Sequence, residues 1–172
     1  SDTNLSDANL SEADLYKANL SGAYMINADL YKANLIRANL IGANLRDAKL
    51  RDANLRDAEL VDTDLSGANL IDANLSYASL MNADLSDTNL SDANLRRADL
   101  CGASLRGADL SGADLAGTIG NRREIKSIEM SRYAITYTKD IIQIGCQNHS
   151  IEEWSKWRDN KAWIKKMEEG AL

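Results

Sequence analysis

A leucine recurs every five residues from Leu5 to Leu115, and this spacing constrains the fold of the chain more than any other feature. The 23 positions hold 22 Leu and one Met, Met25. The residue two places before each of them is Ala in 20 cases, and Thr in the other three (Thr3, Thr63 and Thr88). The residue between them is Asn or Asp in 18 cases. Residues 3–118 are therefore an almost unbroken run of the unit A-[ND]-L-x-x.

A period of five residues fits neither a helix nor a straight strand. In a helix of about 100° per residue, a step of five residues turns each Leu by about 140° and scatters the side chains around the axis. In a strand, the odd spacing sends alternate Leu to opposite faces. A chain that turns a corner every five residues can bury every Leu, with Asn or Asp bonded to the backbone at the corner. The pattern therefore predicts a solenoid whose two variable positions face water.

Side chains of one kind also recur every 20 residues, which bears on the number of sides per coil. One such column is apolar and consists of Ile41, Val61, Met81 and Cys101. Another consists of Asn34, Asn54, Asn74 and Asn94. Four pentapeptides per coil would stack both columns. Seven of the ten glycines occupy the second variable position, where a tight corner most needs them.

The repeated unit A-[ND]-L-x-x resembles the pentapeptide-repeat family. That resemblance implies an all-β solenoid, a right-handed quadrilateral β-helix of about six coils with inward stacks of Leu and Ala. At about 4.8 Å between neighbouring strands, such a rod is roughly 28 Å long. We therefore expect a β-helix over residues 1–118 and a C-terminal capping segment, short strands followed by helix, over residues 119–172.

The C-terminal segment differs sharply in composition, because residues 121–172 hold all three Trp, the single His and 10 of the 20 basic residues. Three stretches rich in β-branched residues are expected strands: 125–130, 134–138 and 141–144. Ser150 to Glu153 has the S-x-x-E form of a capping box, so we expect helix behind it and again near 161–169. The run 142–154 resembles an appendage of some bacterial and phage pentapeptide-repeat proteins, which implies no activity. Its apolar residues suit a cap over the exposed end of a solenoid.

The sequence contains no evident catalytic, cofactor-binding or metal site. Cys146 and His149 form a C-x-x-H pair, but a zinc site needs two more ligands, and the chain has no second Cys or His pair. A buried Cys beside a strand end and a His near a helix start explain the pair better. The Asp residues recur with the repeat rather than as isolated acid–base pairs, and no phosphate loop is present. We expect no cofactor, no metal and no enzymatic activity.

Composition also narrows the partners and the location. A net charge of −6 argues against direct binding of nucleic acid, which needs a basic surface. No stretch approaches the ~20 apolar residues of a membrane span, and no secretory signal opens the chain. The two cysteines lie in different segments and form no disulfide framework, so a reducing, cytoplasmic location is expected. Ser1 stands where Met would begin a complete chain, which indicates trimming and leaves a removed leader open.

The variable positions carry one candidate surface for a partner. Four consecutive outward positions predict an apolar belt around one coil: Ile26, Tyr31, Ile36 and Ile41. Ile41 also begins an apolar column that continues through Val61 and Met81. Such a surface could exceed the few hundred Å² that are usual on a monomer. It could bind a protein partner, bind a second copy in a homodimer, or be covered by the C-terminal helix. Three Arg-Asp pairs at residues 46–47, 51–52 and 56–57 predict only a solvated belt of salt bridges.

Three classes of function follow. A non-enzymatic interaction or scaffold module fits the rod and its apolar column. The family resemblance also implies DNA mimicry, since some members, including quinolone-resistance proteins, imitate duplex DNA and bind DNA gyrase. Residues 1–120 hold 18 acidic and 10 basic residues, a net charge of −8, whereas a duplex of roughly 28 Å carries roughly 16 negative charges. The acidic row Asp52, Asp72 and Asp92 could still imitate a short row of phosphates. We rank the scaffold first, a DNA mimic that binds a type II topoisomerase second, and an enzyme last.

Overall fold

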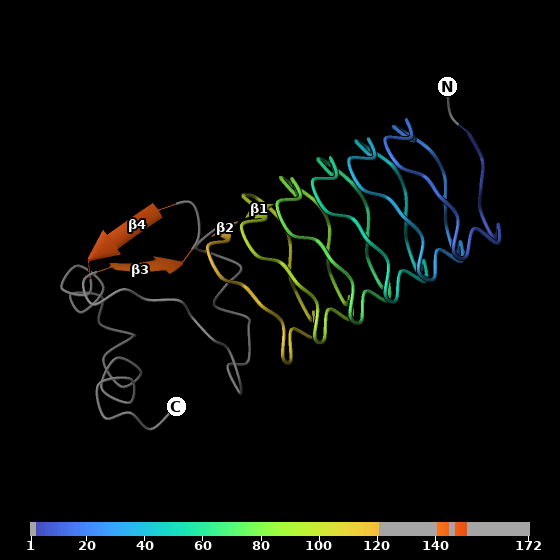
Figure 1. Cartoon of the computed structure of the whole chain (residues 1–172). Coiled ribbons are helices and arrows are strands. Elements are labelled where there is room, and N and C mark those ends of the chain that lie inside the picture. Colours follow the sequence, from blue (N-terminus) through green and yellow to red (C-terminus); the bar gives the residue numbers. More distant parts are fainter. Residues whose placement is uncertain (1–2, 121–140, 145–146, 151–172) are drawn as a thin grey trace.

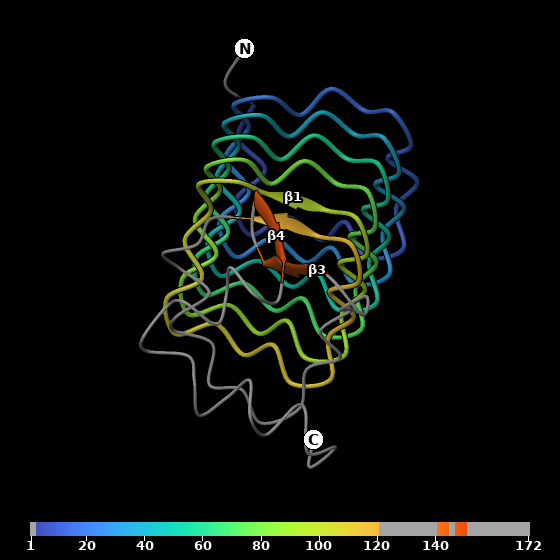
Figure 2. The ribbon, with the colours of Figure 1, turned by 90° about the vertical axis from the view of Figure 1, so that its left-hand side faces the viewer.

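Parallel bridges between residues 20 apart run along the chain and define its architecture. The computed structural model describes residues 3–120, 141–144 and 147–150. The bridges begin at Asn4 with Tyr24 and continue in steps of five to Asn94 with Asp114. Each coil is therefore 20 residues long and contains four pentapeptides. The coils stack into a rod, seen from the side in Figure 1 and from its C-terminal end in Figure 2.

Backbone hydrogen bonds between coils accompany every bridge. Around the first one, Leu5 N–H donates to the carbonyl of Tyr24 at 2.7 Å, and Tyr24 N–H donates to the carbonyl of Thr3 at 2.9 Å. The same two bonds recur, five residues on, at the following bridges. Since each side makes only a short contact with the next coil, the regular repetition of these bonds, rather than any long strand, holds the coils together.

Each corner is a tight turn made by Leu, the two variable residues and the next Ala. In the first of them, Ala8 N–H donates to the carbonyl of Leu5 at 3.1 Å, and Asp7 has a φ of 58°. A positive φ at the third residue is the mark of a type II turn, which favours Gly there. This position does hold the seven glycines, but 16 other residues also adopt a positive φ there. The turn is thus imposed by the coil, and not by glycine alone.

The Asn or Asp of each unit lies in the middle of a side rather than at the corner. It makes the β-bridge, while its side chain supports the turn that follows. Asn4 Oδ1, for example, accepts the N–H of Ser6 at 3.0 Å. The expected bond to local backbone is therefore present, but its donor lies two residues further on. The Leu begins the turn and points inward.

The interior is built of Leu and Ala, as the repeat predicts. Leu30 to Leu110 are buried at every fifth residue, and Met25 takes the place of Leu at one position. The expectation that every Leu is buried is wrong at the two ends of the rod. Leu5, Leu10, Leu15, Leu20 and Leu115 are only partly buried. No further coil of described residues covers Leu5, Leu10, Leu15 and Leu20.

Threonine replaces Ala at buried positions without leaving its hydroxyl unpaired. Thr63 and Thr88 are each 1% exposed. The Thr63 hydroxyl donates to the carbonyl of Leu40 at 2.9 Å, and the Thr88 hydroxyl donates to the carbonyl of Leu85. Because a buried hydroxyl needs a partner, these bonds explain how Thr is accommodated in the Ala column.

The four assigned strands lie at the C-terminal end of the described chain. β1 (Asp99–Leu100) pairs in parallel with β2 (Ile119–Gly120), so the ladder extends two residues past Thr118. β3 (Ile141–Ile144) pairs antiparallel with β4 (Gln147–Ser150) and lies beside β2. β3 matches an expected strand. β4 occupies residues where we expected the approach to a helix, and its polar sequence gave no strand signal. The expected strands at 125–130 and 134–138 and the expected helices lie outside the described residues.

Candidate interaction surface

The predicted belt of apolar residues encircles one coil and does not form one face. Ile26, Tyr31, Ile36 and Ile41 are five residues apart, and each lies at a different corner of the coil. Ile26, Tyr31 and Ile36 are half-buried, whereas Ile41 is 38% exposed. The structure therefore separates the members of the belt by a quarter of a coil each.

The predicted column does come together at a single corner. Ile41, Val61 and Met81 occupy the same position in successive coils, and we call these three residues the apolar stripe. Ile41 and Met81 are 38% and 40% exposed, and Val61 is half-buried between them. Beside Ile41, Gly42 has nothing within 4 Å of where a Cβ would stand, so the space directly over Gly42 is open.

Cys101 occupies the next position of the same column and is disulfide-bonded. This bond differs from the expectation that the two cysteines form no disulfide framework. The chain contains one other cysteine, Cys146, which lies outside the described residues. Position 101 is a half-buried corner in the last stretch of the rod, and the sequence spacing gives no sign of the bond. Disulfides persist in oxidising compartments, and the cytoplasmic location stays a prediction.

Five acidic residues flank the apolar stripe, and the five-residue period does not group them. They lie within three residues of the stripe column in the sequence, on the two sides that meet at this corner: Glu59, Asp62, Asp64, Asp84 and Asp99. We call them the acidic flank. Those two sides, residues 18–25, 38–45, 58–65, 78–85 and 98–105, contain no Lys or Arg. Aligning the sequence in rows of 20 instead of five would have revealed the group.

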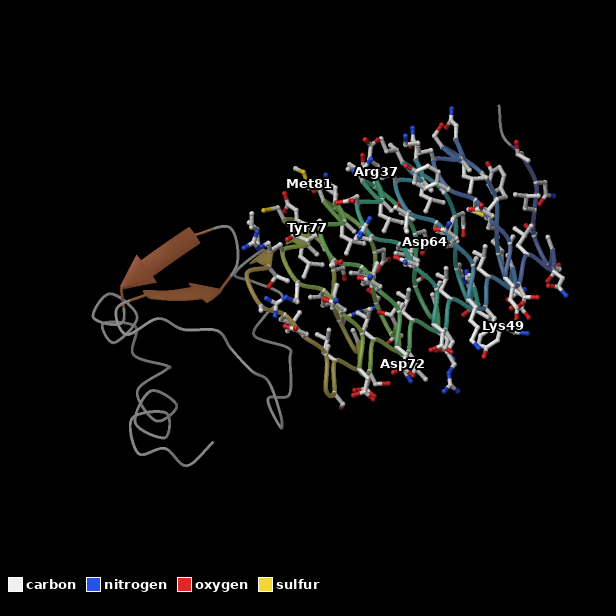
Figure 3. The ribbon with its side chains drawn as sticks, in the orientation of Figure 1. Arg37, Lys49, Asp64, Asp72, Tyr77 and Met81 are labelled. Atoms are coloured by element: carbon white, nitrogen blue, oxygen red, sulfur yellow. The ribbon has the colours of Figure 1, made fainter. Side chains whose placement is uncertain are left out.

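The acidic row lies at the diagonally opposite corner of the rod. Asp52, Asp72 and Asp92 are half a coil away from the stripe, and Figure 3 shows Met81 and Asp72 at opposite edges. Arg51 lies beside two of them, with Nε 3.8 Å from Asp52 and Nη2 3.8 Å from Asp72. Partial neutralisation by Arg51 weakens this row as an imitation of phosphates.

The predicted belt of salt bridges is confirmed. Arg46, Arg51 and Arg56 each lie 3.4–3.8 Å from the Asp that follows them. Arg56 and Arg37 both approach Asp57, at 3.5 and 3.6 Å. All of these side chains are substantially exposed, so each pair contributes at most about 1 kcal/mol to stability.

The polar positions show no arrangement of a catalytic kind in the described part of the chain. An open depression of about 490 Å³ is lined by short polar and charged side chains: Asp7, Asn9, Asn27, Asp29, Asp47 and Lys49. No group of three or more His, Cys, Asp or Glu side chains there could hold a metal ion. His149 belongs to β4, of which the structure describes only the backbone pairing, so the expected absence of zinc stays a prediction.

One carboxyl group shows a shifted pKa with a clear cause. The hydroxyl and the N–H of Ser111 both donate to Asp109 Oδ1, at 2.6 and 2.9 Å, and these bonds hold the pKa of Asp109 below its ordinary value. The carboxyl group of Asp109 is exposed, and the bond it accepts from the N–H two residues on is made along the whole rod. The lowered pKa therefore reflects the turn and not a reactive site.

These features define a β-helix built from pentapeptides, and comparison of sequences agrees. The family described as Pentapeptide repeats (8 copies) matches residues 3–42, 48–87 and 83–119. The chain belongs to the pentapeptide repeat family. No curated protein matches it. Among the described residues, no helix is long and apolar enough to cross a membrane.

Several solved structures resemble the chain. Rfr23, a pentapeptide repeat protein of the cyanobacterium Cyanothece 51142, is 30% identical, with 69% of this chain and 88% of that chain covered and a TM-score of 0.47. HetL, involved in heterocyst differentiation regulation in the cyanobacterium Nostoc sp. strain PCC 7120, is 38% identical over 68% of each chain, with a TM-score of 0.28. Full-length QnrB1, a plasmid-mediated fluoroquinolone resistance protein, is 20% identical, with 72% and 70% covered and a TM-score of 0.35.

Proposed function

We propose that this chain is a non-enzymatic interaction module that binds a protein partner through the apolar stripe. The observation that carries the proposal is the exposure of Ile41 and Met81 in one continuous column. Exposed apolar residues that stand alone are common on soluble proteins, but a joined set at one edge is typical of an interface. The regular core beneath it provides a rigid support.

A capture experiment with matched variants tests this proposal. The protein is immobilised and exposed to an extract of the source cells, and retained proteins are identified by mass spectrometry. The test variant carries Ile41→Ser and Met81→Ser, since Ser21 occupies the same column and shows that the fold accepts Ser there. The control carries Tyr31→Ser and Ile71→Ser in a column that contains Ser11 and Ser91. A specific partner should be lost with the first variant and kept with the second; equal retention by both would contradict the proposal.

A DNA mimic that binds a type II topoisomerase such as DNA gyrase is the second candidate. Its support is the net charge of −8 over residues 1–120 and the stacking of Asp52, Asp72 and Asp92 in one column. Against it stand Arg51, which is close to two of these carboxylates, and the low charge density. Supercoiling assays with purified gyrase separate the two candidates. Inhibition at low protein concentration that weakens with Asp72→Asn and Asp92→Asn would put mimicry first.

Three finer features of the architecture belong to the same proposal. The rod is right-handed, it contains about six coils, and residues 119–172 cap its C-terminal end. The position of β3 beside β2 supports the cap. A homodimer is the alternative assembly, since the partly exposed Leu5 to Leu20 present apolar surface and strand edges. Sedimentation at high protein concentration measures it directly.

A further inference from the structure

We infer that the partner segment at the apolar stripe is a basic amphipathic α-helix that lies along the rod. This inference deepens the function proposed above and rests on it, since it names the chemistry of the partner at the same corner. It combines three observations: the charge around the stripe, the spacing of the stripe residues, and the hydrogen bonds of their backbone.

The charge around the stripe has only one sign. All five charged residues on the two sides that meet at this corner are acidic, and none of the ten basic residues of the rod lies there. Among the described residues, no member of the acidic flank forms an ion pair, whereas Asp47, Asp52, Asp57, Asp72 and Asp114 elsewhere on the rod all do. Carboxylates that form no ion pair around an apolar centre complement a partner with Lys or Arg beside its own apolar residues.

The hydrogen bonds of the acidic flank hold these charges in place. Asp64 and Asp84 accept the N–H of Ser66 and Ser86 at 3.0 and 2.9 Å through Oδ1, and Asp99 accepts the N–H of Cys101 in the same way at 2.9 Å. Asp62 Oδ1 accepts the amide of Asn82 at 3.1 Å. The carboxylates are therefore oriented before a partner arrives, which lowers the entropy cost of pairing with a cation.

The backbone at this corner favours docking by side chains over addition of a strand. The carbonyls of Val61 and Met81 already accept the N–H of Gly42 and Asp62, both at 2.9 Å. A peptide that adds a strand needs unpaired backbone donors and acceptors along an edge. Here those groups are used within the ladder, so apolar side chains and charges remain as the means of recognition.

The spacing of the stripe selects a helix. Successive stripe residues are one coil apart, about 4.8 Å. Side chains on one face of an α-helix recur about every 5.4 Å along its axis, whereas those on one face of a strand recur about every 6.8 Å. A helix parallel to the rod thus stays in register with Ile41, Val61 and Met81, and an extended peptide does not.

A second copy of the same corner is a poor occupant, because a twofold contact would bring two acidic flanks together. The choice of partner is therefore decided by charge, and a binding assay can measure it. The probe is a synthetic helix of about 18 residues with Leu along one face and Lys beside it. Its matched control has Glu in place of each Lys. Fluorescence anisotropy with the full chain gives the affinity of each.

We expect the Lys helix to bind about ten-fold or more tightly than the Glu helix, and to weaken as salt is added. The variant Asp64→Asn with Asp84→Asn should lower its affinity several-fold. Asn is a safe replacement because Asn44, in the same column, accepts the N–H of Arg46 at 3.1 Å. The control variant, Asp52→Asn with Asp72→Asn at the opposite corner, should leave the affinity unchanged.

Three outcomes would overturn the inference: equal affinity for the two helices, an equal loss with the control variant, or no binding by the full chain. Retention of binding when a central Pro breaks the probe helix would exclude a helix as the bound form. If capture from extracts depends on Ile41 and Met81 but the Lys helix does not bind, the interaction module stands and only the chemistry of its partner is wrong. If neither depends on the stripe, both proposals fail.

Discussion

The corner of the apolar stripe and the corner of the acidic row have the same backbone structure but different surface chemistry. Both are tight turns over buried Leu, with a positive φ at their second variable residue. One corner presents Ile41, Val61 and Met81 with acids that form no ion pair among the described residues, and the other presents Asp52 and Asp72 paired with Arg51. The coil fixes the backbone at both corners, while the residues at the variable positions differ. The residues at the corners therefore determine which partners the rod can recognise.

The largest effect is expected from a change to the interior that both corners share. Leu55 is fully buried, and Leu55→Asp places an unpaired charge among apolar side chains, which costs several kcal/mol. We expect loss of the cooperative unfolding transition, measured by circular dichroism against temperature and urea. Arg56→Asp, the same charge at the exposed corner one residue later, is the control and should still unfold cooperatively. A native melting curve for Leu55→Asp would disprove the buried Leu column.

A comparison of two glycines measures the strain at different corners. Gly67 and Gly42 have φ values of 69° and 64°, but a Cβ at Gly67 would stand 2.3 Å from Asp47 Oδ1, while one at Gly42 meets nothing. Gly42→Ala should cost about 1 kcal/mol, from the left-handed conformation alone. Gly67→Ala should cost more, because the Asp47 carboxylate must also move.

Urea unfolding gives both free energies. The double variant Asp47→Ser with Gly67→Ala removes the obstructing carboxylate and should approach the cost of Gly42→Ala. Equal losses for the two single alanine variants would mean that Asp47 yields without cost.

A smaller effect is expected at the acidic row. Arg51→Gln removes the ion pairs with Asp52 and Asp72, yet it should change the free energy of unfolding by less than about 1 kcal/mol, because all three groups are exposed. The variant makes the row more negative, so a gyrase-binding DNA mimic should inhibit better. Stability and supercoiling are measured on the same preparation. A loss above the expected range would show that the ion pairs contribute to the fold.

The smallest effect concerns pH. The pKa of Asp109 is lowered by the hydrogen bonds from Ser111. The folded state therefore binds the proton less readily than the unfolded state does. Its stabilising contribution is fully present above the ordinary pKa of the carboxyl group and is lost as the pH falls through the lowered value.

Asp109→Asn should remove this part of the acid sensitivity and leave the turn intact. Asn89, in the same column, already makes both bonds to Ser91, at 3.0 and 2.6 Å. Urea unfolding at neutral and acidic pH checks the difference between wild type and variant. An unchanged difference in stability between the two pH values would show that Asp109 does not contribute.

The sequence alone predicted the repeat, the solenoid and the inward Leu and Ala, and together with the family resemblance it indicated four pentapeptides per coil. It could do so because one short unit recurs, so every local preference is repeated and no long-range contact is needed to recognise the pattern. It also predicted the hydrogen bonds of Asn and Asp, including all seven Asp of the middle position, each of which accepts the N–H two residues on. The repeat pattern predicted Asn or Asp at the corner, whereas the turn is made by Leu, the two variable residues and the next Ala. The five-residue spacing by itself does not say which of the five residues form the turn.

Which of the variable residues share a surface depends on how the coils stack, and the repeat does not show this. A residue in a solenoid has neighbours 20 positions away as well as beside it, so Ile26 and Ile41 are close in sequence but lie on different corners, while Ile41 and Met81 form one column. The same stacking sets the acidic flank apart from Arg51 and its neighbours, and it leaves the first four Leu partly exposed at the end of the rod. The strand β4, with its polar sequence Gln147–Ser150, is likewise defined by pairing with β3, because backbone pairing requires no apolar pattern.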